Sequence, residues 1–280
     1  MTTISGVTSS DLQPALEAAR AAALAAGALL GPEAGRVHRT EAKGDGSPVT
    51  NLDLEADRII QSHLRRAFPD DLVLSEESSE PVAPEDGGRF WLVDPLDGTR
   101  DFAAGSPEFA VHIALVVAGR PVVAVVHQPA TGLLFEAVAG TGAFRQLGGR
   151  RQALAVSGSS SLDGFRVGVS RRAPGERLSR LLLESPLGRH AVPQGASLKL
   201  TAVAAGELDA TLCLHDREKV WDSCAPSLII AEAGGRVTDV DGRPLLYGGP
   251  DPVHHRGIVT SNGRCHEALC ALATRYWPAP

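Results

Sequence analysis

Residues 90–102 read FWLVDPLDGTRDF, and this stretch constrains the fold more than any other part of the sequence. An apolar run that is typical of a buried strand leads directly into three acids, Asp94, Asp97 and Asp101. Like charges gathered behind a buried strand cost free energy through mutual repulsion and partial loss of hydration. The segment is therefore either a site for a bound cation or an ordinary loop whose carboxylates face solvent.

The residues around these acids predict a strand, a tight turn and the start of a helix. Pro95 is expected to stop the strand, and Gly98 gives the turn its backbone freedom. Thr99 is then a candidate N-cap for a helix that begins near Arg100. A strand that leads through a turn into a helix is the repeating unit of α/β folds.

The same turn offers oxygen ligands for a metal ion. Asp94 and Asp97 flank the turn, and the Leu96 carbonyl lies between them. Carboxylate and carbonyl oxygens are the ligands that Mg²⁺ takes from proteins. The Gly98 and Thr99 amides could in addition face an anion at the helix N-terminus. Taken alone, the segment fits equally well a turn whose acids only cap and contact solvent.

Further acids follow two other apolar runs. Glu76 and Glu77 come shortly after the run at residues 72–74, and Asp222 comes directly after Val220 and Trp221. Any one of them alone is typical of a solvated acid. Acids that recur at the ends of strands are how α/β sheets build metal and phosphate sites. The recurrence therefore favours a metal site.

The first half of the sequence predicts two helices followed by a strand-rich region. Residues 11–31 and 51–68 have helical patterns, and Thr50 is placed to cap the second helix. Residues 39–50 contain Gly and Pro and predict a loop between them. Strands are predicted at residues 72–75, 90–94, 111–117 and 121–129.

Strands and helices alternate in the second half of the sequence. A Ser- and Gly-rich segment near residues 155–163 separates it from the first half. We therefore expect an α/β (α+β) fold with two subdomains, residues 1–158 and 159–280. The predicted strands are 165–170, 210–214, 236–240 and 257–261, and the predicted helices lie near 174–184, 197–206, 222–234 and 264–274.

Charge and cysteine content exclude several classes of protein. A net charge of −6, from 27 Lys and Arg against 33 Asp and Glu, gives no broad footprint for a nucleic-acid polymer. The four cysteines show no CxxC pair and no matched Cys/His spacing, which argues against structural zinc and a disulfide framework. The N-terminus lacks the basic segment of a signal peptide, and no run reaches the ~20 apolar residues of a membrane span. We expect a cytoplasmic protein.

Four separated motifs resemble those of the Mg²⁺-dependent, lithium-sensitive phosphatases of the inositol monophosphatase superfamily. They are Asp53 after VT, the glutamates at 76–77, DPLDGT at 94–99 and WDSCAP at 221–226. Their order and spacing agree along nearly the whole chain. The resemblance implies a layered α/β/α/β/α sandwich that hydrolyses a small phosphate ester.

Other segments are most similar to the 3'(2'),5'-bisphosphate nucleotidases of that superfamily. They are residues 43–50, 107–129 and 195–210, with SLK at 197–199 as the most specific piece, because inositol phosphatases usually lack that lysine. The resemblance implies removal of the 3'-phosphate of adenosine 3',5'-bisphosphate, a by-product of sulfate assimilation. His215 stands about where inositol phosphatases carry a glutamate that contacts substrate hydroxyls, which disfavours inositol.

Two alternatives to a nucleotidase stay open. One is an inositol or sugar phosphate phosphatase, for example for fructose 1,6-bisphosphate. The other is a non-catalytic metal- or nucleotide-binding regulator on the same fold. The resemblance also leaves open whether the chain is a monomer or a homodimer.

The resemblance implies two to three Mg²⁺ ions, with Asp94 as a ligand shared by the first two. A third, more loosely held ion would lie by Glu76 and the loop at residues 43–48. Most ligands belong to the first subdomain, and the second subdomain completes the site. The implied ligands are Glu76, Asp94 and the Leu96 carbonyl for the first ion, and Asp94, Asp97 and Asp222 for the second.

Catalytic and substrate-binding roles follow from the same resemblance. Thr99 and Asp53 would orient and deprotonate a water, and the proton would pass to a carboxylate such as Asp53 or Glu76. Without the resemblance, Asp53 would be interpreted as an acid that complements the helix dipole, and Lys43 fits a solvated loop lysine equally well. The implied substrate contacts are Lys43, Gly98, Thr99, Gly195, Ser197, Lys199 and Arg217.

Overall fold

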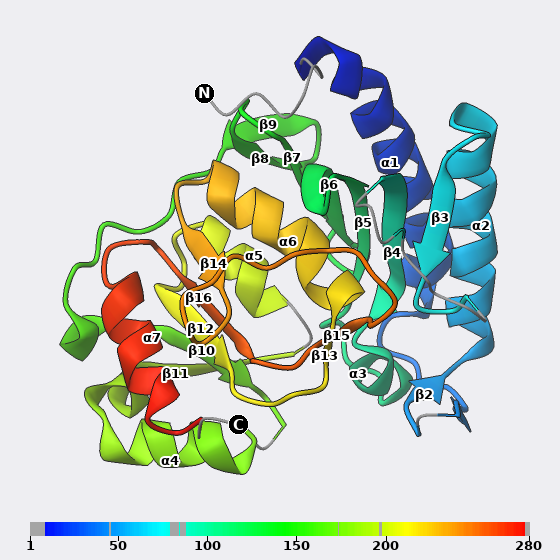
Figure 1. The fold of residues 1–280 in the computed structure, drawn as a ribbon. Coiled ribbons are helices and arrows are strands. Elements are labelled where there is room, and N and C mark those ends of the chain that lie inside the picture. Colours follow the sequence, from blue (N-terminus) through cyan, green and yellow to red (C-terminus); the bar gives the residue numbers. More distant parts are fainter. Residues whose placement is uncertain are drawn as a thin grey trace.

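The computed structural model describes residues 9–44, 46–78, 84, 88–172, 174–195 and 198–277. Its helices and strands form five layers in the order helices, sheet, helices, sheet, helices (Figure 1). The α/β/α/β/α sandwich implied by the sequence is therefore confirmed. Ser197, one of the predicted substrate contacts, lies outside the described residues.

The first layer consists of α1 (Ser9–Leu30) and α2 (Asn51–Ala67), which lie side by side against one face of the larger sheet (Figure 1). α1 turns small side chains toward the sheet, among them Ala19, Ala22 and Ala26, all fully buried. Small residues let the helix approach the Val, Ile and Leu side chains of the strands closely. This packing fixes α2, which carries Asp53, beside the sheet.

α2 begins where the sequence predicts it. The Thr50 Oγ1 accepts hydrogen bonds from the backbone N of Leu52 at 3.1 Å and of Asp53 at 3.4 Å. In return the Asp53 Oδ2 accepts one from the backbone N of Thr50 at 2.8 Å. This capping box satisfies amides that the helix itself leaves without partners.

Replacing Thr50 with alanine is expected to lower the free energy of unfolding by about 1 kcal/mol, because the helix loses its cap. Thr50→Ser keeps the hydroxyl and should stay within about 0.5 kcal/mol of the parent chain. Urea denaturation of the three proteins measures both differences. An alanine variant as stable as the parent would show that the capping box contributes nothing.

The second layer is a seven-stranded sheet with the order β3-β4-β5-β6-β7-β8-β9. β3 runs parallel to β4, and all other neighbouring pairs are antiparallel. The first four strands were predicted from the sequence, and the last three were missed. The strands are β3 (Leu72–Ser75), β4 (Arg89–Asp97), β5 (Ala110–Val117), β6 (Arg120–Gln128), β7 (Leu133–Val138), β8 (Ala143–Leu147) and β9 (Arg150–Ala153).

β4 continues past Pro95, so the predicted end of this strand was wrong. The strand runs on to Asp97, and its register with β5 shifts between Asp94 and Asp97. A proline has no amide to give to a sheet, and such an irregularity is where a strand can accommodate it. The shift falls at the acids Asp94 and Asp97.

The predicted N-cap role of Thr99 was also wrong. Gly98, with a φ of 91°, is the N-cap residue of the short helix α3 (Thr99–Ala103), and no side chain caps this helix. A left-handed backbone at this position favours glycine, which has no Cβ to clash. The Thr99 hydroxyl is therefore available for contacts within the site.

The fourth layer is a five-stranded sheet with the order β11-β10-β12-β16-β14. β10 is parallel to both β11 and β12, whereas β16 is antiparallel to both β12 and β14. β11 was not predicted from the sequence. The strands are β10 (Val167–Ser170), β11 (Ala191–Gln194), β12 (Ala210–Cys213), β14 (Arg236–Thr238) and β16 (Ile258–Ser261).

Helices α5 (Leu198–Ala204) and α6 (Val220–Glu232) form the middle layer, and α4 (Glu176–Glu184) and α7 (His266–Thr274) form the outer one (Figure 1). All four were predicted, with ends shifted by two residues or fewer. Trp221 and Ile229 of α6 pack in one core with Phe90 of the larger sheet. α6 is thereby held with its N-terminus near the acids of β4.

The remaining described elements are short. They are η1 (Gly31–Glu33), the hairpin of β1 (Glu41–Ala42) and β2 (Pro48–Val49), η2 (Leu162–Gly164), η3 (Pro186–His190), and the pair β13 (Glu218–Lys219) and β15 (Val253–His254). The subdomain boundary at residue 158 stays a prediction. No helix in the described ranges has the length and apolar character needed to span a membrane.

Candidate active site

Glu76, Asp94 and Asp222 meet in space although they are far apart in the sequence. Each offers a carboxylate oxygen that lies within 4.8 Å of those of the other two. β3 and β4 are parallel neighbours, so Glu76, directly after β3, and Asp94, late in β4, reach the same edge of the sheet. Asp222 joins them from the first turn of α6.

These carboxylates lie in an electrostatically unfavourable setting. Burial raises the pKa of Asp94 well above its ordinary value, and the charges of Glu76 and Asp97 add to the effect. Burial and then the charge of Glu218 raise the pKa of Asp222 in the same direction. A divalent cation among the carboxylates would stabilise their charged forms. Because the donors are all oxygen, the residues present fit Mg²⁺.

The turn after Asp94 contributes two further oxygens. The Leu96 backbone N donates to the Asp94 Oδ1 at 3.0 Å. The Leu96 carbonyl oxygen lies 3.1 Å from the Thr99 Oγ1, whose single proton has a closer acceptor in the Asp53 Oδ1, so the carbonyl lone pairs can serve an ion. The Asp97 Oδ2 lies 3.8 Å from the Nε2 of His112. Burial lowers the pKa of His112, so this core imidazole is neutral at pH 7 and does not offset the acidic charge.

Thr99 and Asp53 form a hydrogen-bonded pair across two elements. The Thr99 Oγ1 donates to the Asp53 Oδ1 at 2.8 Å, and the Asp53 Oδ2 accepts from the Thr50 Oγ1 at 2.6 Å. Asp53 is only 1% exposed, so these hydrogen bonds hold it without competition from solvent. Asp53 is therefore both the helix-capping acid and the hydrogen-bond partner of Thr99, while its part in deprotonating a water stays a prediction.

Lys43 lies against the acids rather than in solvent. Its Nζ is 2.7 Å from the Glu76 Oε1 and 2.6 Å from the Glu77 Oε1, and its side chain is 18% exposed. Burial works to lower the pKa of Lys43, but the charges and hydrogen bonds of the two glutamates outweigh it and raise that pKa. For the acid Glu77, burial has the opposite effect and raises the pKa to about 7, although the hydrogen bond and charge of Lys43 work to lower it. Lys43 thus balances part of the negative charge.

A cleft of about 280 Å³ exposes most of these groups. Lys199, from the start of α5, brings a positive charge to its wall. Asp53 lies behind Thr99 and is not part of the lining. The predicted residues that line the cleft are Glu76, Asp94, Leu96, Asp97, Gly98, Thr99, Lys199 and Asp222.

Lys43 is not part of this lining, and two further predicted substrate contacts, Gly195 and Arg217, lie elsewhere. The Gly195 backbone N donates to the Glu108 Oε2 at 3.0 Å, and Glu108 in turn forms an ion pair with Arg171 at 2.6 Å. The Gly195 amide is therefore occupied by a protein carboxylate. Arg217 lines a neighbouring pocket of about 300 Å³ together with His215. For both residues, a role in substrate binding stays a prediction.

The sequence reasoning missed Arg172 and Ser170. Both line the cleft, and the Arg172 Nε donates to the Asp101 Oδ1 at 2.9 Å. Ser170 is the last residue of β10, which delivers both side chains to the cleft. The sequence contained a pattern that could have indicated them, because two arginines directly follow the predicted strand at residues 165–170.

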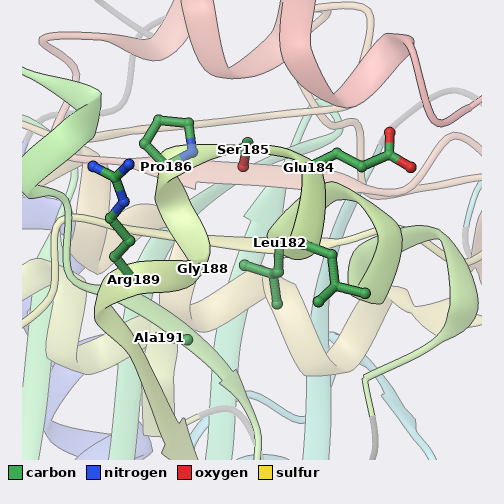
Figure 2. Close-up of a pocket in the computed structure, with 8 residues that line it drawn as sticks. Leu182, Glu184, Ser185, Pro186, Gly188, Arg189 and Ala191 are labelled. Carbon is green, nitrogen blue, oxygen red and sulfur yellow. The ribbon is translucent and has the colours of Figure 1, made fainter.

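A larger pocket of about 610 Å³ lies at the corner formed by α4 and η3 (Figure 2). Glu184, Ser185 and Arg189 are among its lining residues. It contains one carboxylate side chain and none of the residues predicted for the site. Its size therefore does not outweigh the chemistry of the carboxylate cleft.

Comparison with known proteins identifies the family. Residues 11–277 match the model of the inositol monophosphatase family. The chain belongs to the inositol monophosphatase family. An IMPase from Thermotoga maritima has a similar structure, with a TM-score of 0.79, 28% sequence identity, and coverage of 94% of this chain and 98% of that one. The chain is thus a phosphatase of this family.

Relatives of this family member carry different names. The 3'(2'),5'-bisphosphate nucleotidase CysQ of Escherichia coli is 36% identical over 210 residues, or 73% of this chain and 81% of that protein. The histidinol-phosphatase of Streptomyces coelicolor is 37% identical over 248 residues, or 85% and 88%. Because these identities are nearly equal, overall similarity does not select one substrate.

Proposed function

We propose that this chain is a Mg²⁺-dependent phosphomonoesterase that removes the 3'-phosphate of adenosine 3',5'-bisphosphate. The convergence of Glu76, Asp94 and Asp222 is the observation that carries the proposal. The Thr99–Asp53 hydrogen bond beside them supports hydrolysis rather than binding alone. The similarity to CysQ and the presence of Lys199 in the cleft support a nucleotide with two phosphates.

In this proposal Glu76, Asp94 and the Leu96 carbonyl would hold one Mg²⁺. Asp94, Asp97 and Asp222 would hold a second, and a third, looser ion would lie by Glu76 and the loop at residues 43–48. When bound, Mg²⁺ supplies positive charge that stabilises the phosphoryl oxygens and makes a nearby water more acidic. Asp94 is suited to serve two ions, because it is 1% exposed and fixed by the Leu96 backbone N.

The Thr99–Asp53 pair orients the attacking water. Since the Thr99 hydroxyl proton is engaged by Asp53, the lone pairs of Oγ1 can accept a hydrogen bond from a water in the cleft. The water oxygen attacks phosphorus as the bond from phosphorus to the 3'-oxygen breaks. The water proton passes to a carboxylate, Asp53 by way of Thr99 or Glu76 directly, and the leaving oxygen is protonated from solvent.

Two cationic side chains among the lining residues support a substrate with a second phosphate. Lys199 and Arg172 line the same cleft as the carboxylates. A phosphate that is not cleaved needs a cationic partner apart from the metal ligands, and lysine and arginine are the usual ones. An inositol monophosphate would place hydroxyls there instead.

Lys199→Ala is expected to raise the KM for adenosine 3',5'-bisphosphate about tenfold or more, with kcat changed much less, because a charge-assisted hydrogen bond to the uncleaved phosphate is lost. Arg120→Ala, which removes an exposed cation at the start of β6, should leave KM unchanged. Steady-state kinetics at saturating Mg²⁺ measure both. A fall in kcat with KM unaltered would contradict this role of Lys199.

A substrate panel tests the proposed function. Phosphate release with Mg²⁺ would be compared for adenosine 3',5'-bisphosphate, inositol 1-phosphate, fructose 1,6-bisphosphate and histidinol phosphate. The proposal requires the highest kcat/KM for the nucleotide. A large preference for another ester would show that the chain is a phosphatase with a different substrate from the one proposed.

A non-catalytic regulator is the alternative from a different class. It would bind Mg²⁺ and nucleotide but release no phosphate from any ester of the panel. The buried Thr99–Asp53 hydrogen bond argues against it, since pure binding has no need of a pair that orients a water. Binding without turnover at saturating Mg²⁺ would favour the regulator.

Three further properties are part of the proposal. We propose that the enzyme is cytoplasmic and that its partner is a small phosphate ester. We also propose that lithium inhibits it, as the sequence resemblance implies. A homodimer stays a prediction alongside the monomer. Cell fractionation, inhibition by LiCl and sedimentation measure the three properties separately.

A further inference from the structure

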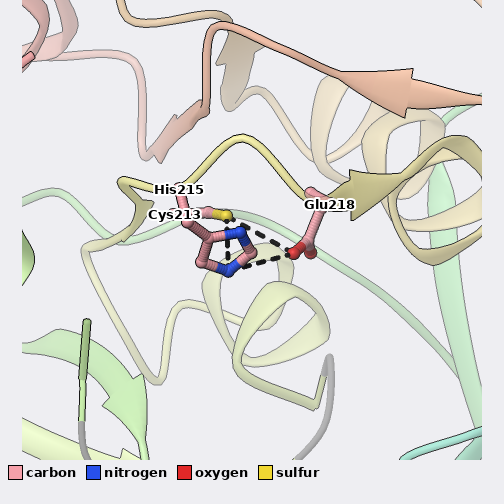
Figure 3. Close-up of side chains that lie close together, drawn as sticks. All are labelled: Cys213, His215 and Glu218. Carbon is pink, nitrogen blue, oxygen red and sulfur yellow. Dashed lines mark hydrogen bonds and ion pairs between the residues drawn. The ribbon is translucent and has the colours of Figure 1, made fainter. Parts of the chain in front are cut away.

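Cys213, His215 and Glu218 form a compact group outside the carboxylate cluster (Figure 3). Cys213 ends β12, His215 lies in the following turn, and Glu218 begins β13. The Cys213 Sγ is 3.3 Å from the His215 Nε2 and 3.4 Å from the Glu218 Oε2. The His215 Nε2 is 3.6 Å from the same Glu218 oxygen. The three atoms thus form a nearly equilateral triangle.

We propose that these three side chains form a further metal site, separate from the Mg²⁺ ligands. It takes Zn²⁺ or a similar divalent ion. Zinc binds sulfur at about 2.3 Å and nitrogen or oxygen at about 2.0–2.2 Å in a tetrahedron. In such a tetrahedron the sulfur lies about 3.5–3.7 Å from each other ligand atom, and nitrogen and oxygen ligands lie about 3.3–3.5 Å apart. The three separations in this group lie within about 0.3 Å of one face of that tetrahedron, so an ion could bind with little movement.

The donor types select the ion. A thiolate and an imidazole favour Zn²⁺ and its neighbours, whereas Mg²⁺ favours oxygen alone. The carboxylate cluster has no sulfur or nitrogen donor among its described side chains. The two sites therefore differ in metal preference. They are neighbours, because Glu218 lines both pockets.

An entry path and an open coordination position are present. All three side chains line the pocket of about 300 Å³ beside the carboxylate cleft. The His215 side chain is 41% exposed and the Glu218 side chain 17% exposed, so solvent reaches the group. A water in this pocket would supply the fourth ligand, as in zinc sites with three protein ligands.

A hydrogen bond from the Cys213 thiol to Glu218, together with one from the His215 Nε2 to the Cys213 sulfur, would also account for the distances. The test therefore uses a signal that only a metal–thiolate bond produces. Cobalt(II) replaces zinc in such sites, and sulfur ligation gives it a near-ultraviolet charge-transfer band that oxygen ligands do not give. The probe is Co²⁺ added to the reduced, metal-free, full-length protein.

The expected result is a charge-transfer band that saturates at one Co²⁺ per chain, disappears on addition of Zn²⁺ and persists in excess Mg²⁺. Cys213→Ser should abolish the band. Cys265→Ser, which removes another partly exposed thiol, and Asp94→Asn, which alters only the carboxylate cluster, should both retain it.

Absence of the band in the parent chain, or its survival in Cys213→Ser, would overturn the proposal. If Cys213→Ser does not fold, His215→Ala tests the proposal instead. Its side chain is partly exposed, so this variant should still fold. The histidine variant should lower the Co²⁺ affinity by about tenfold or more. Unchanged affinity in that variant would equally overturn the site. None of these results depends on phosphatase activity, so the proposed function is tested independently.

Discussion

Asp94→Asn is expected to lower kcat by about 10³-fold or more while the chain stays folded, because Asp94 is a ligand of both proposed Mg²⁺ ions. Asparagine has nearly the same shape, and its side-chain oxygen can still accept the hydrogen bond from the Leu96 backbone N. The substitution removes one buried negative charge from a cluster whose members raise one another's pKa. Phosphate release at saturating Mg²⁺ measures the loss.

A second measurement separates loss of metal from loss of fold. Added Mg²⁺ should raise the melting temperature of the parent chain, since an ion that binds only the folded state stabilises it. It should hardly change that of Asp94→Asn. Without Mg²⁺ the variant should melt no lower than the parent, because one source of repulsion is gone. Asp163→Asn changes an acid that is 74% exposed and should behave like the parent throughout. Turnover of Asp94→Asn equal to that of the parent would refute the assignment.

Thr99→Val is expected to lower kcat by about 10²- to 10³-fold, because the hydroxyl that orients the water is lost. Valine matches threonine in shape, so packing at this buried position changes little. Mg²⁺ should still raise the melting temperature of this variant, since its carboxylates are intact. This combination of retained metal binding and lost turnover distinguishes Thr99 from the metal ligands.

Thr99→Ser is the matched control, because serine keeps a hydroxyl within reach of the Asp53 Oδ1. It should retain turnover within about tenfold of the parent. Asp53→Asn should resemble Thr99→Val, since asparagine accepts the Thr99 proton less strongly than a carboxylate does. Comparable activity of Thr99→Val and Thr99→Ser would show that the hydroxyl plays no part in the reaction.

Features that depend on near neighbours in the chain could be predicted from the sequence. Thr50 and Asp53 are three residues apart, and their capping box is a local pattern. The ends of β3 and β4 were marked by acids after apolar runs, which is why Glu76 and Asp94 were recognised as candidates. The alternation of strands and helices gave the layered fold class, and the family resemblance gave the order of the layers.

Features that depend on distant partners could not be predicted in this way. Glu136 is fully buried in β7, where Arg20 and Arg151 pair with it at 2.8 and 2.9 Å. A buried glutamate interrupts the apolar pattern of a strand, so β7 was missed. Pro95 was expected to end β4, because the sequence does not reveal that β4 and β5 pair again after the register shift between Asp94 and Asp97.

The site shows the same division between local and distant information. The local pattern alone predicted that Thr99 caps α3, and only the family resemblance paired it with Asp53; its hydroxyl donates to Asp53, 46 residues earlier in the chain. The occupation of the Gly195 amide by Glu108 also joins residues 87 positions apart. Patterns along the chain therefore identified which side chains to consider, the family resemblance grouped them, and the folded structure shows which of them meet.

The most direct test of the central claim is a crystal structure of the protein grown with Mn²⁺ in place of Mg²⁺, examined by anomalous scattering. Mn²⁺ takes the same oxygen ligands and can be located by its anomalous signal. We predict a strong peak among Glu76, Asp94 and Asp222, with Asp94 in direct contact. A map with no peak there, and with the three carboxylates pointing away from one another, would contradict the account.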